Sequence, residues 1–160
     1  QKYEKPVIKI DTIFDAFIRA GKKCAIIAHG SCSMGKIFLE REMDYYIFPN
    51  IEEANACAAR LIMEDQYDFI ACYNGNYDTI MHYNGPESTA ALGELRMNSH
   101  AFSVLNELIK TCWAGHHTLM GFAMDHGCHE IDGGCGSHGL DMEEDINICH
   151  FYGAYPSATK

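Results

Sequence analysis

Short apolar runs alternate with longer segments of helical periodicity along this chain, and no other feature limits its possible folds as strongly. Five runs have the length and the apolar content of strands: residues 24–29, 45–48, 68–74, 118–124 and 146–152. Segments of helical pattern separate most of these runs at the spacing of βαβ units. The alternation predicts an α/β fold, with three layers (α/β/α) around a mostly parallel sheet.

Three helices are predicted: one before the first strand, over residues 12–20, and two between strands, over residues 51–66 and 88–114. The middle one has the clearest signal, because Asn50 can cap its first turn. Its apolar residues recur at helical spacing on one face: Ala54, Cys57, Ala58, Leu61 and Ile62. Residues 75–85 and the glycine- and cysteine-rich stretch after residue 127 are expected to be loops. The acidic residues Glu143, Glu144 and Asp145 are predicted to be solvated or to begin a short helix.

The bulk composition restricts the partners that this chain is expected to have. Its 160 residues suit one α/β domain, 48% are hydrophobic, and the formal net charge is −10. We therefore expect no nucleic acid polymer as a partner, and no apolar run suggests a membrane partner. Several of the eight cysteines lie inside apolar runs, which favours reduced thiols and a cytoplasmic location. Because the chain begins at Gln1 and not at Met, export stays open.

Residues with metal-binding side chains follow two of the predicted strands. Asp78 and His82 come after residues 68–74 and, four apart, would share one face of a helical turn. Asp125 and His126 directly follow residues 118–124, and His138 lies a short loop further on. If both strands are parallel members of one sheet, these side chains meet at its carboxyl edge. Carboxylate oxygens and imidazole nitrogens are ligands for divalent metals, so the pattern predicts a metal site.

The same loop allows a rival interpretation. Cys128, His129, Cys135 and His138 offer the ligand types of a closed structural zinc site. Three of these residues, Cys128, Cys135 and His138, are spaced as Cys-x6-Cys-x2-His, which matches no established zinc-finger pattern. Alternatively, Cys128 and Cys135 form a disulfide if the protein is exported.

The motifs together resemble a known enzyme family. Asp-x-x-x-His-x-x-Gly-Pro (78–86), Asp-His-Gly (125–127) and the His138-Gly pair look like the metal-binding carboxyl half of the alkaline phosphatase superfamily. The closest similarity is to its type I phosphodiesterase and nucleotide pyrophosphatase branch, and residues 11–27 resemble the helix and strand that follow the nucleophile region there. The resemblance implies two divalent metal ions, zinc first and manganese as an alternative. It implies that one ion is bound by Asp78, His82 and His138, and the other by Asp125 and His126.

The resemblance also implies an activity and a missing part. In the family, a Ser or Thr nucleophile and another Asp ligand lie upstream of the region matched here, where this chain has only about ten residues. We therefore expect a fragment of a larger metalloenzyme domain, inactive by itself, from a hydrolase acting on a small-molecule phosphate ester. Ser31 and Ser33 are expected to be turn residues and not substitutes for the nucleophile. The alternatives are a phosphomutase or a non-catalytic metal-binding module; the Cys-x-Pro-x-Arg signal of sulfatases is absent.

Overall fold

The computed structural model describes residues 7–30 and 32–158, so Ser31 lies outside the described residues. The chain comprises two compact units, Gln1–Gly75 and Asn76–Lys160. Helices and strands occur in both, which confirms the α/β class. The organisation as one domain stays a prediction.

The first unit contains the parallel sheet that the sequence predicted. Its strands are β1 (Cys24–His29), β2 (Asp44–Phe48) and β3 (Phe69–Cys72), in the order β2-β1-β3. The central strand β1 pairs in parallel with both neighbours. Its residues 24–28 are all buried, as expected for a central strand that is covered on both faces.

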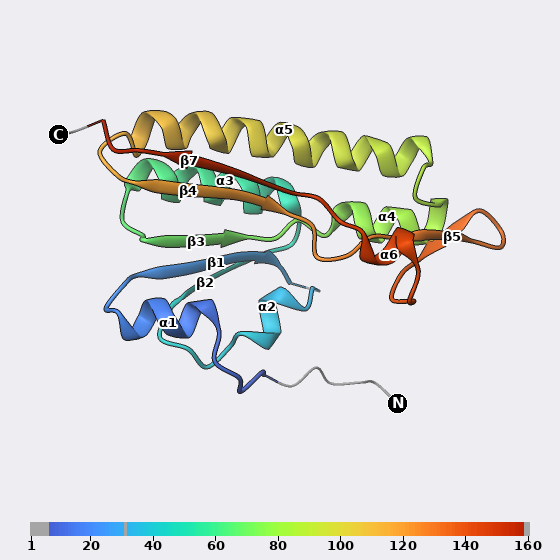
Figure 1. The fold of residues 1–160 in the computed structure, drawn as a ribbon, viewed down its shortest axis with the longest axis horizontal. Helices are drawn as coiled ribbons and strands as arrows, with labels where there is room; N and C mark the ends of the chain where they lie inside the picture. Colours follow the sequence, from blue (N-terminus) through green and yellow to red (C-terminus); the bar gives the residue numbers. More distant parts are fainter. Residues whose placement is uncertain (1–6, 31, 159–160) are drawn as a thin grey trace. The chain divides into compact units, whose positions relative to one another are not determined.

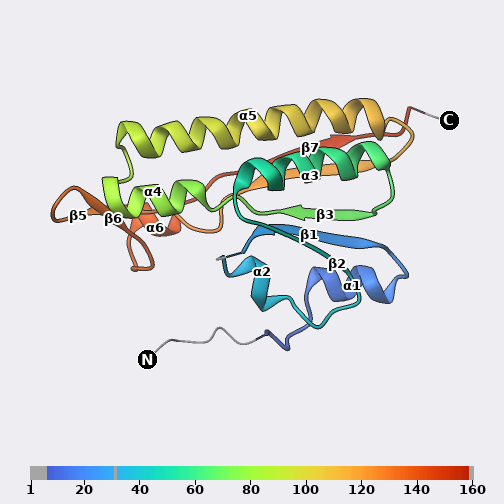
Figure 2. The ribbon, with the colours of Figure 1, turned by 180° about the vertical axis from the view of Figure 1, so that it is seen from behind.

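Helices cover both faces of this sheet. Figures 1 and 2 show α3 (Ile51–Glu64) on one face, with α1 (Ile13–Arg19) and α2 (Met34–Ile37) on the other. Phe14 of α1 forms a buried cluster with Cys24 and Ile26 of β1. The predicted three-layer arrangement is therefore present within the first unit.

The cap predicted for α3 is formed. The Asn50 side chain accepts a hydrogen bond from the backbone N–H of Glu53, which satisfies one of the amide groups that the first helical turn leaves without a partner. All five residues of the predicted apolar face are buried. The helix ends at Glu64, two residues before the predicted end, because Asp65 adopts a left-handed conformation with φ of 50°.

The second unit is built from three helices and four strands within its described residues. They are, in chain order, α4 (Asn76–Asn84), α5 (Thr89–Cys112), β4 (Thr118–Ala123), β5 (His129–Ile131), β6 (Cys135–Ser137), α6 (Glu143–Ile146) and β7 (His150–Tyr155). Strand β4 pairs with β7 (Figure 1), and β5 forms a hairpin with β6 (Figure 2).

The pairing of β4 differs from the prediction of a buried strand in a parallel sheet. It runs antiparallel to β7, and its residues alternate between half-buried and exposed. Small residues conceal this alternation in the sequence, since Gly121 and Ala123 occupy exposed positions where a larger polar side chain would have signalled it. The last strand also begins later than predicted, at His150.

Two predicted loops contain regular structure. Residues 76–84 form helix α4, although their helical propensity is weak, because tertiary packing buries Met81 completely. The glycine-rich loop contains the β5–β6 hairpin, whose turn places Gly133 and Gly134 at positive φ. No helix in the described part of the chain is long and apolar enough to cross a membrane.

Candidate metal centre

Helix α4 presents the first pair of predicted ligands. Asp78 and His82 are one helical turn apart, and both side chains are partly exposed, at 35% and 39%. Met81 lies between them in sequence and is fully buried, which fixes the rotation of the helix. The two side chains therefore share one face of α4, as the sequence predicted.

A glycine lets the hairpin approach this face. A Cβ atom at Gly136 of β6 would lie 2.6 Å from the Met81 carbonyl oxygen and 2.7 Å from its sulfur, so only glycine fits without displacement. The Gly136 carbonyl oxygen then lies 2.9 Å from His82 Nδ1. A carbonyl oxygen can only accept, so His82 Nδ1 donates this hydrogen bond. In the neutral ring, Nε2 then carries a lone pair.

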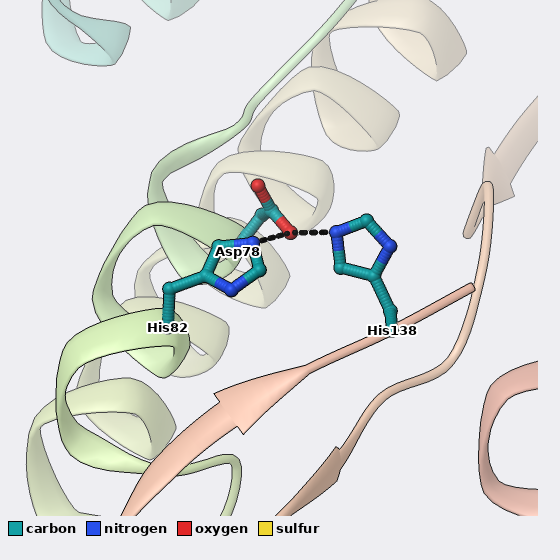
Figure 3. Close-up of side chains that lie close together, drawn as sticks. All are labelled: Asp78, His82 and His138. Atoms are coloured by element: carbon teal, nitrogen blue, oxygen red, sulfur yellow. Dashed lines mark ion pairs between the residues drawn. The ribbon is translucent and has the colours of Figure 1, made fainter. Parts of the chain in front are cut away.

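One carboxylate oxygen lies at the centre of the site. Asp78 Oδ1 is 3.2 Å from His138 Nε2 and 3.5 Å from His82 Nε2 (Figure 3). All three ligand atoms lie within 4.8 Å of one another. Ligands about 2.1 Å from a tetrahedral zinc ion are separated by roughly 3.4 Å, so these distances fit one shared ion.

The hydrogen bonding of Asp78 supports this fit. Its Oδ1 atom is buried yet accepts no hydrogen bond from the described residues, although three imidazole nitrogens, of His82, His138 and His126, lie within ion-pair distance. A buried polar atom without a hydrogen bond is costly in a native structure. A divalent cation would satisfy it, and the set of one carboxylate and two imidazoles suits zinc better than a metal that prefers oxygen ligands.

The second predicted pair lies beside the first. His126 Nε2 is 3.9 Å from Asp78 Oδ1 and 3.9 Å from Asp125 Oδ1. The His126 ring stacks on that of His138, with centroids 3.8 Å apart. His126 Nδ1 donates to the carbonyl oxygen of Gly127 at 2.8 Å, which again leaves Nε2 for a ligand. All five predicted residues thus gather in one cluster inside the second unit.

The cluster assembles for a different reason than the predicted one. The sequence argument placed both pairs at the edge of one parallel sheet, but β4 belongs to an antiparallel pair with β7. Within the second unit, strand β6 packs against helix α4. His138 directly follows β6, so it comes within reach of Asp78 on α4. Packing of a helix against a hairpin therefore brings these ligands together.

The sequence analysis did not predict a buried hydrogen-bonded pair, which is formed by Asp145 and His129. Asp145, predicted to be a solvated residue or part of a short helix, has a side chain only 2% exposed, and its Oδ1 lies 2.8 Å from His129 Nδ1. Burial raises the pKa of Asp145, but hydrogen bonds from His129 and from the backbone of Leu140 and Gly139 outweigh it and lower the pKa below its usual value. No sequence signal separates Asp145 from its two acidic neighbours, since only the fold selects which one is buried.

The rival cysteine and histidine site does not form among the described residues. The Cys128 sulfur lies 3.4 Å from the Tyr77 hydroxyl, and the Cys135 thiol points toward the Tyr83 carbonyl oxygen. His129 is held by Asp145. All eight cysteines are thiols, so the alternative disulfide between Cys128 and Cys135 is also not formed.

Comparisons with known proteins were made for the whole chain. No family model and no curated protein sequence matches it. Among solved structures, the chain is similar to an inactive variant of murine ectonucleotide pyrophosphatase/phosphodiesterase 5 in complex with AMP. The TM-score is 0.57 at 17% sequence identity, and the match covers 77% of this chain and 34% of that one. At this identity the likeness establishes a shared fold, and the chain spans about a third of the length of its structural neighbour.

Proposed function

We propose that this chain carries the metal-binding part of a phosphoryl-transfer hydrolase of the alkaline phosphatase superfamily, a phosphodiesterase or phosphatase. One observation carries the proposal: a buried oxygen of Asp78, without a hydrogen bond from any described residue, lies within 3.5 Å of Nε2 atoms of both His82 and His138. The shared fold with a nucleotide pyrophosphatase/phosphodiesterase supports the choice of superfamily.

Two divalent ions, zinc first and manganese as the alternative, are the proposed cofactors. Asp78, His82 and His138 would hold one ion, and Asp125 and His126 the other. Such ions supply Lewis acidity and neutralise the charge that develops on a transferring phosphoryl group. The chain's own residues orient these ligands: the carbonyl oxygens of Gly136 and Gly127 hold the Nδ1–H groups of His82 and His126, so both Nε2 atoms face the cluster.

The proposed substrate is a small phosphate ester of the nucleotide type. The structural neighbour was solved with AMP, which belongs to this class. This chain has a net charge of −10 and would repel an anionic ester, so bound cations are needed to attract it. We assign the nucleophile to no residue of this chain; Ser33 directly precedes α2, and its carbonyl oxygen accepts hydrogen bonds from that helix.

A metal titration tests the ligand assignment. The metal-free chain is titrated with zinc, and bound metal is quantified after dialysis. His82→Ala should weaken binding about tenfold or more, because it removes one of three ligands. His100→Ala is the matched control: it removes an exposed histidine of α5 and should bind zinc as the parent does. Equal zinc content in all three proteins would contradict the proposal.

An activity assay separates the proposed enzyme from its alternatives. The zinc- or manganese-loaded chain is incubated with a p-nitrophenyl phosphodiester and with AMP. We expect AMP to bind in a metal-dependent way with no turnover at an enzymatic rate. Fast hydrolysis would mean that the chain holds its own nucleophile. Metal binding without metal-dependent AMP binding would favour a non-catalytic metal-binding module, and transfer of phosphate between the hydroxyls of a sugar phosphate, offered in a parallel incubation, would favour a phosphomutase.

The cellular location stays a prediction. We propose the cytoplasm because several cysteines lie inside apolar runs, with export as the alternative.

A further inference from the structure

Asp145 occupies an unusual position for an acidic residue in a run of three. Its neighbours Glu143 and Glu144 are exposed, whereas Asp145 is only 5% exposed as a whole residue. A buried carboxylate is retained where several donors satisfy its oxygens. The hydrogen-bond partners of Asp145 therefore indicate its role in the structure.

These partners belong to the two segments that follow His126 and His138, two of the candidate metal ligands. The Asp145 backbone carbonyl accepts the N–H of Gly127 at 2.8 Å, and Gly127 directly follows His126. Its Oδ2 atom accepts the N–H of Leu140 at 2.8 Å, two residues beyond His138. Its Oδ1 atom accepts from His129, which opens β5. Asp145 is thus hydrogen-bonded to the residue directly after His126 and to a residue two positions after His138. The rings of these two histidines stack on one another.

The contact on the His126 side is close. A Cβ atom at Gly127 would lie 1.9 Å from the carbonyl oxygen of Glu144, so the two backbones touch and only glycine is tolerated there. The helix that carries Asp145 therefore cannot shift without moving the segment of His126. The His126 and His138 rings, with centroids 3.8 Å apart, lie next to this junction.

We propose that Asp145 is a positioning residue that sets the separation of His126 and His138, and with it the spacing of the two ion sites. The metal part of this inference rests on the proposed function. The structural part does not, because the three hydrogen bonds exist without any ion. A residue that orients ligands without touching the metal commonly changes metal affinity about 10- to 100-fold when it is removed.

The test compares three variants of the full chain. Asp145→Ala removes both side-chain hydrogen bonds. Asp145→Asn is the conservative variant: its carbonyl can accept from Leu140 while its amide donates to the other tautomer of His129. Glu144→Ala is the matched control, since it truncates an exposed carboxylate one residue away. Each chain is titrated with Co²⁺, whose visible absorption reports both affinity and ligand geometry.

We expect Asp145→Ala to weaken Co²⁺ binding about tenfold or more and to change the absorption bands. Asp145→Asn should recover most of the affinity, and Glu144→Ala should match the parent. Merely lowered stability would leave the spectrum of the folded protein unchanged. Identical Co²⁺ affinity and spectrum in Asp145→Ala and the parent would overturn the proposal.

A second measurement separates this inference from the proposed function. In the metal-free chain, the imidazole NMR signals of His126 and His138 report their stacking, and Asp145→Ala should shift both while Glu144→Ala shifts neither. A parent that binds no Co²⁺ would refute the metal site, and these signals would still decide whether Asp145 positions the histidines. If Asp145→Ala does not fold, His129→Gln should shift the same signals relative to those of the parent, and unchanged signals would overturn the proposal.

Discussion

The two units of this chain are stabilised in different ways. In the first, residues 24–28 of the central strand and one face of α3 are buried. In the described part of the second, the buried hydrophobic residues are only Met81, Ala91 and Ile109. Both buried polar residues of the described chain, Asn98 and Asp145, belong to the second unit.

The comparison shows that the stability of the fold and the orientation of individual side chains depend on different interactions. Apolar burial contributes roughly 25 cal/mol per Å² and has no preferred direction, so it makes a stable framework without fixing a particular side chain. Hydrogen bonds contribute less but have strict geometry. The second unit holds its histidines with such bonds, for example from His82 to Gly136 and from His129 to Asp145. A bound ligand should therefore stabilise the second unit more than the first.

The largest effect should follow a core truncation in the first unit. Leu61→Ala removes a fully buried side chain of α3 and should lower the free energy of unfolding by about 2–5 kcal/mol. Met63→Ala, on the exposed side of the same helix, should change it by less than about 0.5 kcal/mol. Amide hydrogen exchange, followed residue by residue, should show faster opening of β1 and α3. Equal acceleration in α5 would show instead that the two units unfold together.

Zinc should act on the other unit. At a free concentration 100 times its dissociation constant, it should raise the stability of the second unit by about 2.7 kcal/mol. The single tryptophan, Trp113, lies in this unit, so its fluorescence during urea unfolding reports the change. At the same zinc concentration, His82→Ala, with affinity lowered tenfold or more, should keep only about half of this shift or less. A zinc-dependent slowing of exchange confined to β1 would contradict the contrast between the units.

Matched helix caps should give an intermediate effect in each unit. Asn50 caps α3 in the first unit and Ser88 caps α5 in the second, each through a side-chain oxygen that accepts a backbone N–H. Replacing either by Ala should cost about 1 kcal/mol. Hydrogen exchange should assign each loss to the unit that contains the cap. A loss that appears in both units after either substitution would mean that they are thermodynamically coupled.

Acid should produce the smallest effect, because burial of Asp145 opposes the hydrogen bonds that lower its pKa. The folded-state pKa lies below the unfolded value of about 3.9, so the stabilising contribution is complete above that pH and is lost as the pH falls through the folded-state value. Asp145→Asn should remove this dependence from Trp113-detected unfolding between about pH 5 and pH 2. An unchanged acid profile would show that Asp145 does not contribute to it.

The first unit provides the matching carboxyl. The hydrogen bond from the Thr12 side chain, with further ones from the Thr12 backbone and Arg41, lowers the pKa of Asp15 against the effect of burial. Asp15→Asn should therefore change the acid profile of hydrogen exchange in β1 and leave the Trp113 signal as it is. The reverse pattern would contradict the assignment of each carboxyl to its own unit.

Much of this molecule could be predicted from local sequence signals. The strand at residues 24–29, the helix that Asn50 begins and the α/β class follow from apolar periodicity and capping, which act over a few residues. The five candidate metal ligands were also found in this way, because carboxylates and imidazoles after predicted strands are visible in the sequence.

Tertiary structure decided the rest, because it depends on contacts between residues far apart in the chain. The antiparallel pairing of β4 with β7 joins segments more than 25 residues apart in sequence, and nothing within β4 specifies its partner. The burial of Asp145, and not of Glu144 beside it, depends on donors from Leu140 and His129. The sequence by itself determined which side chains are candidate metal ligands; the packing of the hairpin against α4 decided that His138 meets Asp78 and His82, since a long-range contact leaves no local periodic trace.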